Sequence, residues 1–254
     1  ERGFVLEGRG LEPLHARSLM LATGGHPSGR KLVEALGHQV VPPVPSLFSL
    51  ALQAPELTAC SGIAIDDVGL DLKLGSQRFR QTGRVLITHR GLSGPATLRL
   101  SAFAARALHQ SRYRGELKLD WSAGLGRQGV EQRLQQWRQD QARRTLSAAK
   151  PFEHLPRRLW QAFLAMAGVE ADRRWADLPL KAERQLVELL CAQRLSIKGR
   201  GPFGEEFVTA GGVALGDVNL ATMESGRCPG LYLAGEPLDV DGVTGGFNFQ
   251  ACWS

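Results

Sequence analysis

The sequence predicts an α/β domain that is split by an inserted β-barrel and a helical subdomain. Apolar runs that end at glycine pairs or small residues occur near both ends, at 19–25 and 230–250. Between them, residues 46–122 alternate apolar and polar side chains, which is typical of half-buried strands. In residues 127–195, apolar side chains instead recur every three or four positions, which indicates amphipathic helices. We therefore expect an α/β domain at 1–45 and 203–254, a barrel at 46–126 plus about 195–202, and a helical subdomain at 127–194.

The first segment, residues 1–45, is predicted to contain strands and one helix. Residues 4–7 and 14–17 have the pattern of a strand pair. A helix is expected from Ser28 to Leu36, with Ser28 as its N-cap and Gly37 as its stop signal. The proline-rich run 42–45 fits neither a helix nor a central strand, so we place the domain boundary there.

The middle of the chain is predicted to contain a barrel or sandwich followed by three helices. The alternating segments are 61–68, 70–74, 84–88 and 117–121, and their near-regular spacing favours a small antiparallel barrel or sandwich. A single helix from Pro95 to Leu108 is expected to interrupt them. The helical stripes that follow are Val130/Leu134/Trp137, Leu155/Leu159/Phe163/Met166 and Leu186/Leu189/Leu190.

The C-terminal stretch carries the strongest indication of a binding site. Leu231 to Ala234 form an apolar run typical of a buried parallel strand, and Gly235-Glu236 end it with an acid. Ligands of open α/β sheets bind at that edge. Gly245-Gly246 are predicted to open a helix, whose N-terminal N–H groups favour electron-rich oxygens. Residues 19–25 and 207–213 are two further apolar runs that contain a Gly-Gly pair. We therefore expect a cofactor-binding site. The alternative is an ordinary strand–loop–helix turn.

Six segments resemble the bacterial NAD(P)/FAD-dependent oxidoreductases of the BaiN and aminoacetone oxidase type. They are LATGG (21–25), EALGHQVVPPVPSLFSL (34–50), VLITHRGLSGPATLRLS (85–101), PFEHLPRRLW (151–160), FVTAGGVALGDVNLATMES (207–225) and PGLYLAGEPLDVDGVTGGFNFQACWS (229–254). The resemblance implies a Rossmann-like, glutathione-reductase-like FAD domain split by a β-barrel and a helical cap. The family's N-terminal GxGxxG unit is absent, and the last helix stops early, so we expect a fragment of such an enzyme.

The resemblance also implies roles for individual residues. Glu236, after Gly235, would bind FAD ribityl or ribose hydroxyls, with Asp239 as a further contact or a turn cap. Near the flavin pyrimidine ring we expect Gly245, Gly246, Phe247 and Asn248. Beside the adenosine we expect Thr23, Gly24 and Gly25, for which plain turn chemistry is the alternative, and facing the flavin Thr209, Gly211 and Gly212.

The loop of residues 88–95 is the most polar loop of the β-rich insert, and its similarity to the family's THxGLSGP segment implies that it lines the substrate side. His89 is a candidate proton-transfer group and Arg90 a candidate carboxylate binder, although a lone loop histidine is more often structural. The segment between Gly25 and Leu32 is shorter than in the family, which puts in doubt any cofactor contact that the longer loop makes.

Composition and charge limit the function classes. The 254 residues contain no apolar stretch long enough for a transmembrane helix. The 4 cysteines have no CxxC or metal-ligand spacing, so we expect no metal site, and reduced thiols of a cytoplasmic protein. Residues 127–158 hold 8 Lys or Arg and 3 acids within a chain of formal charge +6. Such a face can bind phosphate backbones but is more often simply solvated.

These observations lead to a flavin-dependent oxidoreductase as the expected function. FAD would take electrons from a small-molecule substrate or from NAD(P)H and pass them to an acceptor. We do not expect a membrane or a nucleic-acid partner, and the sequence specifies neither the substrate nor an oligomeric state. The chain alone is expected to be an incomplete enzyme. The alternative is a nucleic-acid-binding flavoprotein or non-catalytic module that uses the basic helical face.

Overall fold

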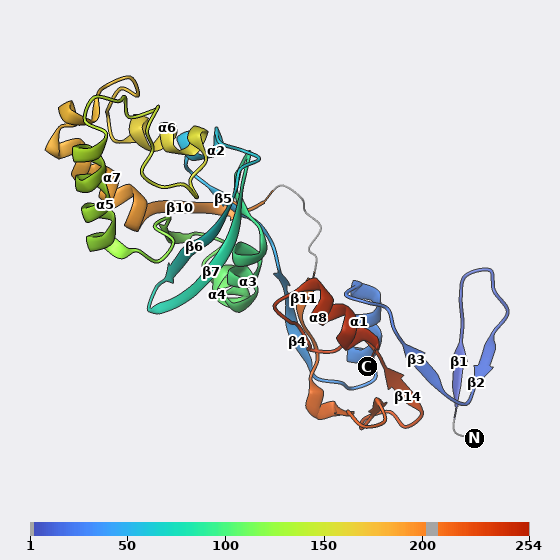
Figure 1. Ribbon diagram of the computed structural model, residues 1–254. Coiled ribbons are helices and arrows are strands. Elements are labelled where there is room, and N and C mark those ends of the chain that lie inside the picture. The colour runs from blue at the N-terminus through green and yellow to red at the C-terminus, as the bar shows by residue number, and fades with distance from the viewer. Residues whose placement is uncertain (1–2, 202–207, 254) are drawn as a thin grey trace. The chain divides into compact units, whose positions relative to one another are not determined.

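The computed structural model describes residues 3–201 and 208–253 of the chain (Figure 1). The chain divides into two units, the first of residues 1–47 with 206–254 and the second of residues 48–205. Among the described residues, no helix combines the length and the apolar character that crossing a membrane requires.

The first unit is built on a sheet of 4 strands in the order β12-β13-β14-β3. Strands β14 (Leu231–Leu233) and β3 (Leu19–Leu21) run parallel with Tyr232 opposite Met20, which confirms the predicted parallel strand. The other members are β13 (Glu224–Ser225) and β12 (Val218–Asn219), both antiparallel to their neighbours. The predicted N-terminal strand pair is confirmed as the hairpin of β1 (Phe4–Leu6) and β2 (Leu14–Ala16).

The first unit also contains two helices, a 3-10 turn and a further strand pair. They are helices α1 (Pro27–Ala35) and α8 (Gly245–Trp253), the 3-10 turn Leu215–Asp217, and the strand pair β4 (Val40–Ser46) and β11 (Val208–Val213). The core contains Leu21, Val33, Val213, Val218, Leu231, Leu233 and Leu238. The start of helix α8 at Gly245 agrees with the prediction.

The cap predicted for helix α1 was wrong by two residues. The helix begins at Pro27, a residue suited to the first turn, and His26 is its N-cap. The ring nitrogen Nδ1 of His26 accepts a hydrogen bond from the backbone N–H of Ser28 (3.2 Å). The stop signal was correct, since Gly37 follows the helix with a φ of 85°.

The glycine pair 211–212 behaves differently from the prediction, whereas the proline-rich run agrees with it. Pro42, Pro43 and Pro45 lie inside β4, which among the described residues pairs with β11 alone and so is an edge strand, where proline is tolerated. Gly211-Gly212 were expected to end a strand but lie inside β11, beside a bulge between Ala210 and Gly212. Phe207, the first residue of that predicted run, lies outside the described residues.

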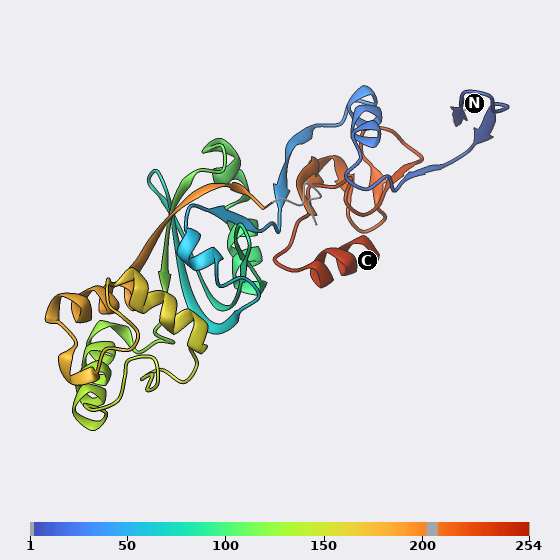
Figure 2. The same cartoon turned by 90° about the horizontal axis from the view of Figure 1, so that it is seen from above.

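The second unit contains a closed barrel in the strand order β10-β5-β8-β7-β6-β9, which confirms the barrel rather than the sandwich (Figure 2). Its strands are β5 (Leu50–Leu52), β6 (Ala64–Leu74), β7 (Gln77–Thr88), β8 (Gly91–Ser93), β9 (Gly115–Asp120) and β10 (Gln193–Arg200). The predicted strands 61–68 and 70–74 are one strand, β6. They join through a bulge between Ile65 and Val68 that places Asp67 at a positive φ of 55°.

Helices accompany the barrel. The helix predicted over 95–108 is two helices, α3 (Pro95–Phe103) and α4 (Ala105–Gln110), because the chain leaves the helical conformation at Ala104. The three later helices are confirmed as α5 (Gly126–Asp140), α6 (Arg157–Met166) and α7 (Leu180–Ala192). The short helix α2 (Pro55–Thr58) and the 3-10 turn Trp175–Asp177 were not predicted.

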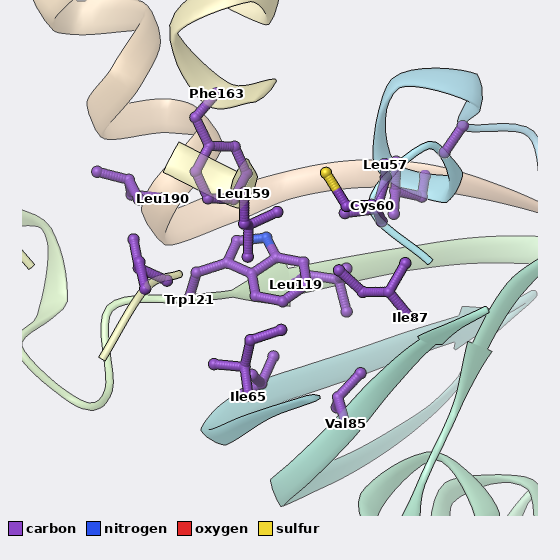
Figure 3. Close-up of a cluster of buried hydrophobic side chains, with 14 of the residues drawn as sticks. Leu57, Cys60, Ile65, Val85, Ile87, Leu119, Trp121, Leu159, Phe163 and Leu190 are labelled. Atoms are coloured by element: carbon purple, nitrogen blue, oxygen red, sulfur yellow. The ribbon is translucent and has the colours of Figure 1, made fainter. Parts of the chain in front are cut away.

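Barrel and helices share one continuous core. Figure 3 shows Trp121, which follows β9, between barrel side chains such as Ile65 and the helical side chains Leu159 and Phe163. Trp121 is 1% exposed, and its indole N–H donates to the side-chain oxygen of Gln193 (2.8 Å). The helices are therefore anchored on the barrel by shared burial.

Candidate functional site

Glu236 joins three segments of the first unit that are distant in sequence. It follows Gly235, whose φ of 76° turns the chain after β14. Its Oε1 accepts a hydrogen bond from the backbone N–H of Thr209 (2.8 Å), and its Oε2 accepts one from Gly25 (3.1 Å). A carboxylate has about four acceptor positions, so each oxygen of Glu236 keeps one for a ligand.

The segment after Glu236 is attached to β11. The N–H of Val213 donates to the carbonyl of Pro237 (2.8 Å), and the N–H of Asp239 donates to the carbonyl of Val213 (2.9 Å). A Cβ at Gly212 would lie 2.5 Å from the Pro237 oxygen, so only glycine permits this approach. The backbone N–H of Asp239 thus ties this segment to the cluster.

The Gly24-Gly25 turn lies against Glu236, whereas Thr23 does not. A Cβ at Gly25 would lie 3.0 Å from Thr209 Oγ1 and 3.4 Å from Glu236 Oε2. The hydroxyl of Thr23 instead packs on helix α1, where a Cβ at Gly29 would lie only 1.8 Å from it. Thr23 therefore packs against α1, and the residues bordering the two hollows described below do not include it.

The start of helix α8 is held by Asn248. Its Oδ1 accepts from the N–H of Gly242 (3.0 Å), and its Nδ2 donates to the carbonyls of Gly242 (3.0 Å) and Thr244 (2.8 Å). The ring of Phe247 covers Gly242 and is 53% exposed. Gly245 and Gly246 have open space on the side where a Cβ would be, and no acceptor for their N–H groups lies among the described residues.

Two hollows meet at Glu236. The larger has a volume of about 360 Å³, within the size range of small-ligand sites. Its lining comprises Val208, Gly235, Glu236, Leu238, Val240, Gly245, Asn248, Phe249, Ala251 and Cys252. The smaller, of about 20 Å³, is bordered by Gly24, Gly25, Thr209, Gly211, Gly212 and Glu236 among others. Nine of the predicted cofactor residues thus border one hollow or the other: Gly24, Gly25, Thr209, Gly211, Gly212, Gly235, Glu236, Gly245 and Asn248.

Sequence reasoning missed two side chains of helix α8 that line the larger hollow, Phe249 and Cys252. Cys252 approaches Gly235 closely, with its Sγ 3.4 Å from where a Cβ would stand. The signal for both was available, because positions 245, 248/249 and 252 fall on one helical face.

His89 and Arg90 belong to the second unit. They form the exposed turn between β7 and β8, where the carbonyl of Arg90 accepts from the N–H of Leu52 (2.8 Å). Within the described ranges, neither side chain makes a hydrogen bond or an ion pair. Both side chains are therefore free to meet a ligand.

Titratable groups elsewhere have structural partners. The backbone N–H of Gln39 and the guanidinium of Arg227 hold the pKa of Asp217 below its usual value. Burial raises the pKa of the Cys191 thiol to about 11, so it stays protonated at neutral pH. Among the described residues, no group of three His, Cys, Asp or Glu side chains could hold a metal ion.

The basic helical segment 127–158 uses most of its charges internally. Arg127 pairs with Glu131 and Glu188, and Arg138 with Glu183. The side chains of Arg133, Arg144, Lys150 and Arg158 donate to backbone carbonyls. Arg143 and Arg157 alone among the eight show no such partner in the described structure, so few of these cations are available to a ligand.

Comparison with known proteins identifies relatives along the chain. Residues 44–208 match the family model described as "HI0933-like protein barrel and H2TH domain". The chain is 31% identical to the ribosomal RNA dihydrouridine synthase of Escherichia coli (strain K12), over 100% of this chain and 62% of that protein. The enzyme of the same name from Haemophilus influenzae is also 31% identical, over 94% of this chain and 58% of the relative.

A third relative has a different substrate in its name. The 3-dehydro-bile acid delta(4,6)-reductase of Clostridium scindens is 29% identical, over 100% of this chain and 63% of its own length. The chain therefore spans about three fifths of the length of the curated relatives that it matches.

Proposed function

Because the chain belongs to the HI0933-like family of flavoprotein-type oxidoreductases, we propose that it provides the flavin seat and the barrel of an FAD-dependent oxidoreductase. The observation that carries the proposal is the Glu236 carboxylate, fixed by two backbone N–H groups at the border of the larger hollow. We further propose that the first unit is part of a glutathione-reductase-like FAD domain, split by the inserted second unit.

The groups around the larger hollow fit a flavin nucleotide. The acceptor positions that remain on Glu236 suit a ribityl or ribose diol, since each hydroxyl can donate one hydrogen bond. The N–H groups of Gly245 and Gly246 at the start of α8 suit the electron-rich pyrimidine edge of the ring. When bound, the flavin supplies the two-electron chemistry, and the chain orients it.

The names of the relatives suggest one substrate chemistry. Dihydrouridine is uridine with its C5–C6 double bond saturated, and a delta(4,6)-reductase saturates carbon–carbon double bonds conjugated to a ketone. The double bond of uridine and the double bonds of the conjugated ketone are alike, because each is an alkene activated by a carbonyl group. We propose such an alkene as the substrate class, with NAD(P)H as the electron donor and His89 as the candidate group that delivers the proton.

Ribosomal RNA is the substrate that two of the three relatives favour by name. We therefore propose a uracil base of ribosomal RNA as the first candidate and a conjugated steroid ketone as the second. The first candidate departs from the expectation, drawn from the sequence, that nucleic acid is not a partner.

An absorbance titration with FAD tests the proposal. When this chain is joined to the family's N-terminal GxGxxG unit, we expect flavin bands that stay with the protein on gel filtration and bleach with NAD(P)H. Glu236→Ala should weaken FAD binding at least about tenfold, since a hydrogen bond to a charged group is worth roughly 1.5–3 kcal/mol. Glu34→Ala, which removes an exposed carboxylate from the same unit, is the matched control. A protein that takes up no FAD would contradict the proposal and favour a non-catalytic binding module.

Product analysis then distinguishes the two substrates. Ribosomal RNA that lacks its natural modifications should gain two hydrogens per modified uridine by mass spectrometry. Reduction of a conjugated steroid ketone without any change in the RNA would reverse the order of the candidates.

A further inference from the structure

Five basic side chains point outward from four adjacent strands of the barrel. We call this surface the basic barrel face; it consists of Lys73 on β6, Arg78 and Arg80 on β7, Lys118 on β9 and Arg194 on β10. The strand order β7-β6-β9-β10 makes these positions neighbours, although the sequence spreads them over more than a hundred residues. At the usual strand spacing, four strands cover about 14 Å.

The strand register places like charges directly opposite one another on this face. Lys73 lies opposite Arg78, and Lys118 lies opposite Arg194. Directly opposed like charges destabilise a sheet, whereas an acid at either position would form a favourable pair. On the other side each lysine lies opposite an acid, Lys73 opposite Glu116 and Lys118 opposite Asp71, so the two like-charge pairs are the positions where positive charge is in excess.

Only two acids share the two rows of residues that contain these cations. Asp71, whose side chain is 14% exposed, has Arg78 Nε at 2.6 Å, Arg80 Nε at 3.2 Å and Lys118 Nζ at 4.0 Å. Glu116 pairs with Arg194 at 2.9 Å. Three cations around one carboxylate leave the face with an excess of positive charge. The side chains of Arg78, Arg80 and Arg194 remain 51%, 65% and 65% exposed.

The composition of the face favours a nucleic acid over a protein. The row across the strands at Asp71 reads Arg80, Asp71, Lys118 and Arg194, and the next row reads Arg78, Lys73, Glu116 and Ser196. Neither row contains an apolar side chain, whereas protein interfaces have an apolar, aromatic-rich core. Exposed arginines and lysines on a rigid sheet are suited to phosphate oxygens.

We propose that the basic barrel face binds the phosphate backbone of RNA and holds the ribosomal RNA substrate against the protein. The inference rests on the proposed function for the identity of the nucleic acid. It assigns RNA contact to the barrel strands rather than to the helical segment 127–158, and the control variant below tests that choice.

Salt-dependent RNA binding tests the assignment. The probe is a fluorescein-labelled hairpin of ribosomal RNA sequence, and Kd is measured by anisotropy over a series of KCl concentrations. The test variant is Lys73→Gln/Lys118→Gln/Arg194→Gln, which leaves Arg78 and Arg80 on Asp71. The control variant is Arg143→Gln/Arg157→Gln/Arg173→Gln, which removes the same charge from exposed positions outside the barrel strands.

We expect the test variant to bind RNA more weakly and to lower the slope of log K against log salt by about 2 to 3, with the control near wild type. Equal slopes for the test variant and wild type would overturn the assignment, and so would an equal loss in both variants. Tight binding of polyglutamate with no binding of RNA would also overturn it, in favour of an acidic protein partner. Because anisotropy requires no flavin turnover, a failure here is separate from a failure of FAD binding or of uridine reduction.

Discussion

Removing the Glu236 carboxylate should release the N–H group of Thr209. This N–H donates to Glu236 Oε1 at 2.8 Å on the side of β11 that faces residues 236–239, and Thr209 is half-buried. A hydrogen bond to a charged group contributes about 1.5–3 kcal/mol. Since about 1.4 kcal/mol is a tenfold change in an equilibrium, Glu236→Ala should speed exchange of the Thr209 amide hydrogen about ten- to a hundredfold.

The two oxygens of Glu236 allow a sharper test. In Glu236→Gln, the one remaining side-chain oxygen should stay with Thr209, because the competing N–H of Gly25 is exposed and can bind water. The Thr209 amide hydrogen should then exchange faster than in the wild type by a factor below about ten, since a neutral hydrogen bond is roughly half as strong as a charged one.

Hydrogen exchange followed by NMR measures both effects residue by residue, without assuming that the two units unfold together. Glu34→Ala serves as the control for the loss of one negative charge. If Thr209 exchanges at the wild-type rate in Glu236→Ala, the carboxylate does not hold β11 and the reasoning is refuted.

Three further substitutions test packing, titration and a buried hydrogen bond. Gly29→Ala should destabilise the first unit by about 1–3 kcal/mol through overpacking, since its Cβ would meet the Thr23 hydroxyl at 1.8 Å; urea-dependent hydrogen exchange measures this. Asp217→Asn should cost stability at neutral pH, and the difference from wild type should vanish as the pH falls through the lowered pKa of Asp217, because only the carboxylate binds Arg227; urea unfolding at several pH values checks this. Trp121→Phe should lower the stability of the second unit by about 1–3 kcal/mol, because it leaves a buried amide acceptor without its indole N–H donor; the fluorescence-detected urea midpoint is the measurement.

Each of these three predictions would be contradicted by one specific result. Gly216→Ala is the control for the first, because open space surrounds a Cβ there, and equal costs at both glycines would contradict the packing argument. A stability difference for Asp217→Asn that grows toward low pH would have the wrong sign for a carboxylate whose pKa is lowered. An unchanged urea midpoint for Trp121→Phe would mean that water replaces the indole donor.

Local periodicity was sufficient to predict most elements of the fold. The alternation in 70–74 and 84–88 and the helical stripes of 127–195 depend on which face of each element is buried, and that information lies within a few residues. The division of the predicted helix 95–108 at Ala104 has no such local mark, since alanine favours helices. The proline-rich run 42–45 was correctly excluded from helices and central strands, but its place in an edge strand depends on the pairing with β11, which only the structure reveals.

The candidate site, too, could be predicted only in part from the sequence. The glycine pairs and Glu236 were identified from the sequence and its family resemblance, but the partners of Glu236 lie 27 and 211 positions away and appear only in the structure. The charges of the basic segment 127–158 were visible in the sequence, but not the carbonyls that bind Arg133 and Arg158. The basic barrel face escaped notice because strand register, not sequence proximity, brings Lys118 beside Arg194.

The inserted unit begins and ends on neighbouring barrel strands, with Leu50 on β5 opposite Arg200 on β10. Its 158 residues (48–205) are continuous in sequence, so this unit can complete its folding before the two halves of the other unit meet. Once the barrel closes, the entropy of joining those halves is that of a connection on the order of ten residues rather than about 150, which saves roughly 2 kcal/mol. The barrel thus holds the two halves of the first unit together, as a covalent cross-link between them would. Variants that slow barrel closure should slow the assembly of the Glu236 cluster, although they change none of its contacts.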